Sequence, residues 1–145
     1  MRRVPATLGH FRAIQAQPAQ AAELAAASAE HCGVLIAEGA QAVIDDDGVY
    51  FIGGAVDMGF GRGDCWSVVA GNCRHMRFAV VHRMVRKFMD EKARQYRRLE
   101  LRADLRCPNA DRWALLLGFE FECVLRRYYE NADAHLFARI QRCPG

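Results

Sequence analysis

The feature that most constrains the fold of this sequence is a long amphipathic stretch over residues 78–96. From Val81 to Phe88, apolar residues recur at the i, i+3, i+4, i+7 spacing of one helix face, and charged residues cover the other face. An apolar run over 64–71 precedes this helix, and a stretch over 98–105 that alternates between apolar and polar residues follows it. The sequence therefore predicts a strand–helix–strand crossover within one sheet.

Shorter patterns on either side of this helix predict the other elements. Thr7 is a residue type that caps helices, Pro18 suits a first helical position, and Gly33 suits a helix end. In chain order we expect a strand over 2–6, helices over 7–15 and 18–29, short apolar runs over 34–37 and 40–44, a strand over 49–56, a flexible connection over 59–63, a strand over 64–71, a helix over 78–96, a strand over 98–105, a helix over 111–117, and strands over 119–129 and 135–140. This order predicts an α/β (α+β) fold with helices packed on a mixed sheet.

Three aspartates and a glycine over 45–48 separate two of the predicted strands. Asp and Gly tolerate the backbone angles of tight turns, so an antiparallel hairpin is expected. Clustered carboxylates also suggest a metal site, but three adjacent side chains on a turn cannot all point at one ion. We therefore expect a solvated turn and no metal.

The length and composition fit one domain over residues 1–145. Of the 145 residues, 52% are hydrophobic and 26% are charged, which is typical of a soluble globular protein. No apolar run approaches the roughly 20 residues that span a bilayer, and no signal peptide follows the basic start. We expect a cytoplasmic protein that does not bind membranes.

The cysteines and histidines show no metal-binding pattern. Cysteines lie at 32, 65, 73, 107, 123 and 143, and histidines at 10, 31, 75, 82 and 135. No cysteines form a C-x-x-C pair, so we expect reduced thiols and no zinc site. Cys65 and Cys73 are candidate nucleophiles; Cys73 has the basic setting that a reactive thiol needs, but no orienting third group is evident.

Motifs in the C-terminal half match a known family. Residues 100–103 read Glu-Leu-Arg-Ala, Asn109 precedes a short helix, and residues 113–120 end in Leu-Gly-Phe-Glu. Residues 126–139 follow as a closing hairpin. In this order the sequence resembles the GNAT (Gcn5-related N-acetyltransferase) superfamily over about residues 60–140, and only loosely before that. The resemblance implies a mixed, mainly antiparallel central sheet with helices on both faces.

A second set of residues is similar to a narrower group. It comprises the glycines at 53–54, Gly-Asp-Cys-Trp over 63–66, the basic helix and the segment 113–119. Together they resemble small GNAT-like proteins of tailed phages, including internal virion proteins of short-tailed phages. This resemblance implies a protein made in the host cytoplasm, with virion or assembly proteins as partners.

The superfamily resemblance also implies an acetyl-coenzyme A (acetyl-CoA) site. Such a site needs backbone N–H groups directed at the pyrophosphate, a splayed strand that receives the pantetheine, and an acid for the leaving thiolate. The residues that match its cofactor-binding pattern are Arg74, His75, Arg77, Ala79 and Asn109.

Two positions depart from the family pattern. Arg77 replaces a glycine, and a side chain there crowds the backbone around the phosphates, although two arginines could instead bind them directly. Ala114 replaces the usual tyrosine acid. The tyrosines at 128–129 lie on a later strand, and Asp57 and Asp64 are expected at a turn or strand end, so no catalytic residue is identified.

Charge is concentrated in the segment 74–98, which holds nine Arg or Lys residues against Asp90 and Glu91. Such a segment is the solvated face of a helix, or it binds phosphates, nucleic acid or an acidic protein.

The sequence is compatible with two functions. One is a catalytically degenerate structural or assembly module that contacts proteins through this basic loop and helix. The other is an acetyl-CoA-dependent N-acetyltransferase, because an amine attacking a thioester needs little acid–base help.

Overall fold

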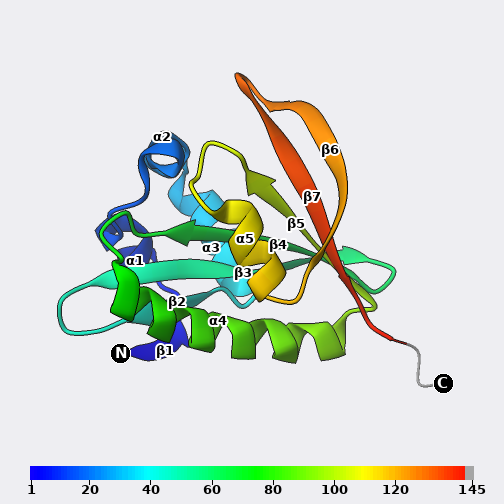
Figure 1. Cartoon of the computed structure of the whole chain (residues 1–145). Coiled ribbons are helices and arrows are strands. Elements are labelled where there is room, and N and C mark those ends of the chain that lie inside the picture. Colours follow the sequence, from blue (N-terminus) through cyan, green and yellow to red (C-terminus); the bar gives the residue numbers. More distant parts are fainter. Residues whose placement is uncertain (143–145) are drawn as a thin grey trace. The chain divides into compact units, whose positions relative to one another are not determined.

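The computed structural model describes residues 1–142 and confirms the predicted mixed, mainly antiparallel sheet (Figure 1). The elements are β1 (Arg2–Pro5), α1 (Leu8–Ala13), α2 (Pro18–Ala26), α3 (Ala29–Ala37), β2 (Gln41–Ile44), β3 (Val49–Gly59), β4 (Arg62–Val69), α4 (His75–Gln95), β5 (Arg98–Asp104), α5 (Ala110–Leu116), β6 (Glu120–Tyr129) and β7 (Ala132–Ile140). The strand order is β1-β2-β3-β4-β5-β7-β6. Strands β4 and β5 pair in parallel, which confirms the crossover through α4, and the pairs β1–β2, β2–β3, β5–β7 and β6–β7 are antiparallel.

The chain divides into two compact units. Unit 1 comprises residues 1–56 and 66–84, and unit 2 comprises residues 57–65 and the chain from Val85 on. Strands β3 and β4 and helix α4 each contribute to both units.

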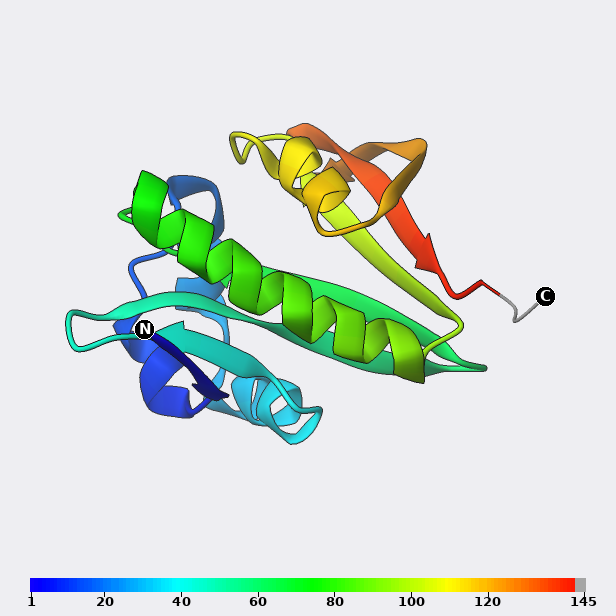
Figure 2. The same cartoon turned by 60° about the horizontal axis from the view of Figure 1, so that its bottom comes forward.

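Unit 1 holds the hairpin of β2 and β3 between helices. Helices α1 and α3 lie on one side of these strands, and the first turns of α4 lie on the other (Figure 2). Its buried core includes Val43, Ile52 and Val81. Thr7 caps α1 as predicted, because its hydroxyl accepts a hydrogen bond from the N–H of His10.

Unit 2 has one covered sheet face and one charged face. On the covered face, His135 of β7 bonds to Asp111 of α5, and Arg139 donates to Asp90 of α4. Successive strand residues point to opposite faces, so Phe137 faces the same side and is buried there. The opposite face carries charged residues of β5, as its predicted alternation implies.

The prediction was wrong for residues 29–37. They form one helix, α3, although Gly33 was expected to end a helix and 34–37 to be an extended run. The physical reason lies in Ser28, whose hydroxyl accepts the N–H of His31 and starts a new helix just after the extended residue Ala27. The predicted helix over 18–29 is therefore interrupted, and Gly33 lies in the interior of α3.

Two further boundaries differ from the prediction. The expected flexible connection over 59–63 is a tight hairpin turn, because β3 continues to Gly59 and β4 begins at Arg62. Gly59, Phe60 and Gly61 all have positive φ, which closes the turn within two residues. Helix α4 begins at His75 rather than at residue 78. Within residues 1–142, no helix is long and apolar enough to cross a bilayer.

Candidate functional site

The predicted strand-to-helix junction is present between β4 and α4. Residues 70–74 join the two elements, and the N–H of Phe78 donates to the carbonyl of Arg74. By helix geometry, the N–H groups of residues 75–77 have no acceptor within α4. Arg74, His75 and Ala79 are exposed in this segment. The first turn of a long helix therefore offers donors of the kind that bind phosphate.

Arg77 lies in the same turn, but residues of the β2–β3 hairpin hold its guanidinium. Arg77 Nη2 donates to Asp47 Oδ2 at 2.6 Å, and Nη1 donates to the hydroxyl of Tyr50. The guanidinium also lies 5.1 Å from the centre of the Tyr50 ring, and the Tyr50 hydroxyl donates to Asp45 at 3.0 Å. We call Asp45, Asp47, Tyr50 and Arg77 the hairpin clamp. Burial, and then the hydrogen bond to Asp45, raise the pKa of Tyr50.

The backbone at position 77 does not require a glycine. The non-glycine residues of positive φ within residues 1–142 are Phe60, Asn109 and Arg127, so Arg77 has an ordinary φ. The free φ of glycine is thus not what this position needs. The arginine at position 77 instead supplies the cation of the hairpin clamp.

The aspartate-rich segment 45–48 is a turn, as predicted. The side chain of Asp45 accepts the N–H groups of Asp47 and Gly48, so its oxygen is used to close the hairpin. Burial opposes ionisation of Asp45, but these hydrogen bonds, the Tyr50 hydroxyl and the Arg77 charge together lower its pKa. Among the described residues, no three His, Cys, Asp or Glu side chains are arranged to hold a metal ion.

One edge of β4 is covered by the chain itself. Ala70 donates to Tyr50 of β3, so alternation places the backbone groups of residues 67, 69 and 71 on the opposite edge. Residues 15–20, which we call the strap, run along that edge. The bonds are Gln20 Nε2 to Ser67 O at 2.8 Å, Val69 N to Gln20 Oε1 at 3.1 Å, Gln17 N to Val69 O at 3.1 Å, and Gly71 N to Gln15 O at 2.8 Å.

The strap was not foreseen from the sequence. It overlaps the start of the predicted helix over 18–29, in which Gln20 carries no signal that distinguishes it from a solvated helix residue. The side-chain amide of Gln20 nevertheless bonds to β4 as a neighbouring strand would. It donates to the carbonyl of Ser67 and accepts from the N–H of Val69. Any ligand that pairs with this edge of β4 has to replace these four bonds.

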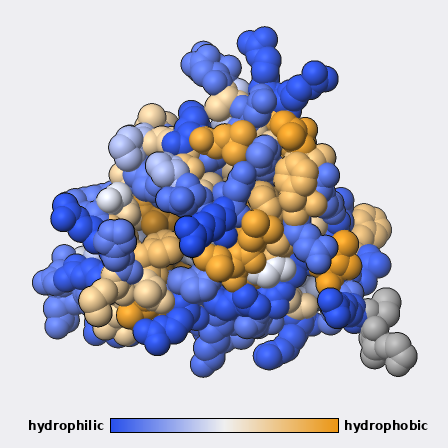
Figure 3. All heavy atoms as spheres, viewed as in Figure 1, coloured by the Kyte–Doolittle hydropathy of each residue, from blue (hydrophilic) through white to orange (hydrophobic). Residues whose placement is uncertain are grey.

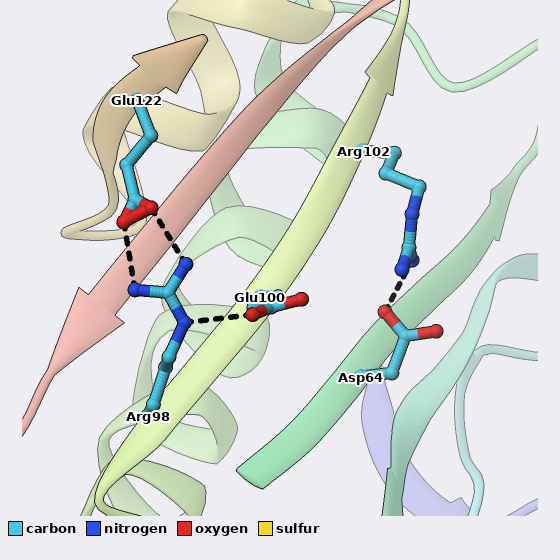
Figure 4. Close-up of polar contacts among 5 residues, drawn as sticks. All are labelled: Asp64, Arg98, Glu100, Arg102 and Glu122. Atoms are coloured by element: carbon cyan, nitrogen blue, oxygen red, sulfur yellow. Dashed lines mark hydrogen bonds and ion pairs between the residues drawn. The ribbon is translucent and has the colours of Figure 1, made fainter. Parts of the chain in front are cut away.

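The charged face of β5 gathers five ionised side chains of unit 2 (Figure 4). Arg98 donates to Glu100 at 2.7 Å and, with both terminal nitrogens, to Glu122 at 2.7 and 2.6 Å. Arg102 pairs with Asp64 of β4. Hydrogen bonds from Arg98 lower the pKa of Glu122. Three carboxylates and two guanidinium groups give this face a charge of −3 + 2 = −1.

The sequence predicted only part of the charged face of β5. The alternation of β5 predicted that Glu100 and Arg102 lie on a wet face, but nothing local indicated the contact between Arg98 and Glu122, which are 24 residues apart. Asp64, expected at a strand end, lies within β4. The ring of Tyr128 contacts Arg102, whose guanidinium lies 5.7 Å from the centre of the ring.

The remaining candidate residues lack a reactive setting. Ala114 is 2% exposed on α5 and offers no proton. Burial, and then the charge of Asp64, raise the pKa of Cys65 to about 12, so this thiol is not ionised at neutral pH. Burial also raises the pKa of Cys73, against the opposing effect of Arg77. Asp57 accepts the N–H of Gly59, as expected of a turn residue.

Asn109 precedes α5 with a left-handed backbone (φ 61°), and its side chain makes no capping hydrogen bond. Its amide is therefore not used to start the helix. No disulfide joins Cys32, Cys65, Cys73, Cys107 or Cys123, and Cys143 lies outside the described residues.

The element order, the parallel β4–β5 pair and the strand-to-helix junction together define the GNAT fold. Several solved structures share it over their full length. Ard1 from Thermoplasma volcanium is similar at TM-score 0.76 and 15% identity, with 98% of each chain covered. The aminoglycoside 6′-N-acetyltransferase from Enterococcus faecium is similar at TM-score 0.73 and 15% identity, covering 100% of this chain and 99% of that one.

A chimera of the spermidine N-acetyltransferase SpeG from Vibrio cholerae and hSSAT is similar at TM-score 0.72 and 13% identity, covering 97% of this chain and 96% of that one. No protein-family profile matches the sequence, and no curated protein is similar to it in sequence. At these identities the likeness establishes the fold alone.

Proposed function

We propose that this chain is an acyl-CoA-dependent N-acyltransferase, which transfers an acyl group such as acetyl to an amine. The strand-to-helix junction carries the proposal, because it places unpaired backbone N–H groups of a long helix directly after the exposed Arg74. The full-length likeness to an aminoglycoside N-acetyltransferase and to a spermidine N-acetyltransferase chimera supports it.

The junction fits the phosphate end of coenzyme A. The N–H groups of residues 75–77 and the guanidinium of Arg74 are the donors that a pyrophosphate needs. His75 and Ala79 of the same unit remain candidate contacts, whereas Asn109 lies in unit 2 and stays a prediction from the sequence. Arg77 belongs to the hairpin clamp in this proposal, because Asp47 and Tyr50 already engage its guanidinium. The edge of β4 fits the amides of the pantetheine once the strap releases its four bonds to Ser67, Val69 and Gly71.

Bound coenzyme A would supply the acyl group as a thioester. The amine has to lose a proton before it attacks, and water can accept that proton. In unit 2, the charged face of β5 has more carboxylates than guanidinium groups, a balance that attracts cations. Position 114 holds alanine, so the leaving thiolate takes its proton from water, and we expect turnover to be slow.

Arg74→Ala is expected to weaken acetyl-CoA binding about tenfold or more, because a hydrogen bond to a charged group is worth roughly 1.5–3 kcal/mol. Isothermal titration of acetyl-CoA measures the change. Arg83→Ala is the matched control, since Arg83 is also an exposed arginine but lies two turns further along α4. Equal losses in both variants would show a general charge effect, and no binding by the unaltered protein at millimolar acetyl-CoA would reject the function.

Gln20→Ala is expected to tighten acetyl-CoA binding at least about fivefold, because two hydrogen bonds worth roughly 0.5–1.5 kcal/mol each, about 1–3 kcal/mol together, no longer have to be broken. The control is Gln41→Ala, whose amide donates to the carbonyls of Gly39 and Ala40. Titration of both variants at one salt concentration gives the comparison. Weaker binding by Gln20→Ala would mean that the strap supports the ligand rather than excludes it.

A second candidate is a non-catalytic binding module, favoured by Ala114 and by the engagement of Arg77 in the hairpin clamp. In this case the basic residues of 74–98 contact an acidic surface of another protein, such as a phage virion or assembly protein, or nucleic acid. If the protein does not bind acetyl-CoA, the result is compatible with this binding module and not with the acyltransferase. A salt-sensitive gel shift would then separate a phosphate contact from a protein contact.

A further inference from the structure

Residues 15–27 lie on unit 1 without burying a side chain. They comprise the strap, the rest of α2 and Ala27, and each of them is exposed or half-buried in the structure. Figure 3 shows weakly hydrophobic and hydrophilic atoms mixed over the part of the surface where Figure 1 places α2. Hydrophobic burial therefore contributes little to holding this segment in place. We call residues 15–27 the lid.

Both ends of the lid join helices that are anchored by buried side chains. Ile14, directly after α1, is 6% exposed, and Cys32 of α3 is 3% exposed. Helices α1 and α3 also contact each other. Ile14 and Ala27 have extended backbone, so each end of the lid is a break between two helices. Breaks of this kind can absorb the backbone rotation of a moving segment.

The strap binds the lid to β4 through a ladder of one residue pair. Ala16 lies opposite Ala70 in an antiparallel bridge, and the two backbone bonds of the strap flank this pair. Gln20 adds the other two bonds through its side chain. The two backbones approach closely, because a Cβ at Gly71 would lie 3.6 Å from Cα of Gln17. Breaking the four bonds therefore frees this edge of β4.

The other edge of the same segment is bound within the buried core. Ala70 is 3% exposed, and its N–H donates to the carbonyl of Tyr50 at 2.9 Å. Tyr50 is itself 2% exposed within β3. Segments with few buried apolar contacts open at a lower free energy than a buried core does. The lid should therefore leave β4 while Ala70 stays bonded to β3.

We propose that the lid opens as one unit about Ile14 and Ala27, and that the closed lid is autoinhibitory because it occupies the edge of β4 that takes the acyl-CoA. The opening is a property of unit 1 alone, whereas the inhibition rests on the proposed acyltransferase function. Acyl-CoA then binds only the open fraction, so its apparent dissociation constant equals the intrinsic constant divided by that fraction. Any change that favours the open lid therefore tightens acyl-CoA binding.

Hydrogen exchange of the full-length protein tests the opening. The N–H groups of Gln17 and Gly71 should exchange together, and at least about tenfold faster than that of Ala70. Gln20→Ala removes neither of their bonds, yet it should speed both exchanges at least about fivefold, because the loss of two other bonds raises the open fraction. Gln41→Ala is the matched control and should leave both rates unchanged. Exchange as slow as at Ala70, or no response to Gln20→Ala, would overturn the opening.

A disulfide lock tests the inhibition. Directly opposite residues of an antiparallel pair without mutual hydrogen bonds have Cα atoms about 4.5 Å apart, which suits a disulfide. Ala16→Cys combined with Ala70→Cys, in a Cys73→Ser background that prevents mispairing, should bind acetyl-CoA when reduced and lose this binding when oxidised. Ala16→Cys alone in the same background is the matched control, and it should bind acetyl-CoA in both states.

The lock separates the inhibition from the function on which it rests. Binding of acetyl-CoA by the locked form, or failure of the two thiols to pair, would overturn the inhibition while the unaltered protein still binds. If the unaltered protein does not bind acetyl-CoA, the acyltransferase function is rejected and the inhibition with it. The exchange rates then still decide whether the lid opens as a unit.

Discussion

Phe119→Ala is expected to lower the free energy of unfolding by about 3–5 kcal/mol, the largest effect that we predict for one substitution. Phe119 is 2% exposed and lies at the junction of α5 and β6, where its N–H donates to the carbonyl of Ala114. Gly118 before it has a φ of 88°, which fixes the path of the chain into the core. The neighbouring backbone is therefore held in place, and removal of the ring leaves a cavity that cannot collapse fully.

Phe60→Ala is the matched control for Phe119→Ala. Phe60 lies in the same unit at the turn between β3 and β4, and its side chain is 86% exposed. The same truncation should change the unfolding free energy by no more than about 0.5 kcal/mol. Urea unfolding of both variants measures the difference, provided that the denaturant slopes agree. A loss below about 1 kcal/mol for Phe119→Ala would contradict the burial of this ring.

Gly53→Ala is expected to destabilise the protein by about 1–3 kcal/mol, although it adds a single methyl group. A Cβ at Gly53 would lie 2.5 Å from Cζ of Phe51 and 2.7 Å from the carbonyl oxygen of Trp66. The Phe51 ring can rotate away, but the Trp66 oxygen belongs to the backbone of the adjacent strand. Strands β3 and β4 would have to separate locally to make room.

Gly33→Ala should instead stabilise the protein. Gly33 lies in the interior of α3, and no atom lies within 4 Å of the position that a Cβ would take. Alanine forms helices better than glycine by about 1 kcal/mol, so this variant should gain up to that amount. Thermal unfolding of the two variants side by side tests the pair. A neutral Gly53→Ala would show that β3 and β4 are not in such close approach.

The sequence predicted those elements whose pattern is local and repeated. Helix α4 followed from its apolar period, β5 from its alternation, and the hairpin over 45–48 from turn chemistry. The segment 29–37 was misread because four apolar residues after a glycine suit a strand as well as a helix. The hydroxyl of Ser28 decided between them, and a single capping bond gives a weak signal in the sequence.

The candidate site was predicted in part, for a related reason. The junction with Arg74 and the absence of the tyrosine at position 114 could be recognised from short motifs. The contacts of Arg77 with Asp47 and of Gln20 with Ser67 join residues 30 and 47 positions apart. Such contacts depend on how the elements pack, and no local pattern of charge or hydrophobicity predicts them.

The hairpin clamp limits which residues position 77 can accept. Replacing Arg77 with glycine would leave the carboxylate of Asp47 and the hydroxyl of Tyr50 without the cation that both now contact. Such a variant would need compensating changes in a hairpin nearly thirty residues upstream. The residue at the start of α4 and the residues of the 45–48 turn are therefore coupled, so that neither can be exchanged without regard to the other.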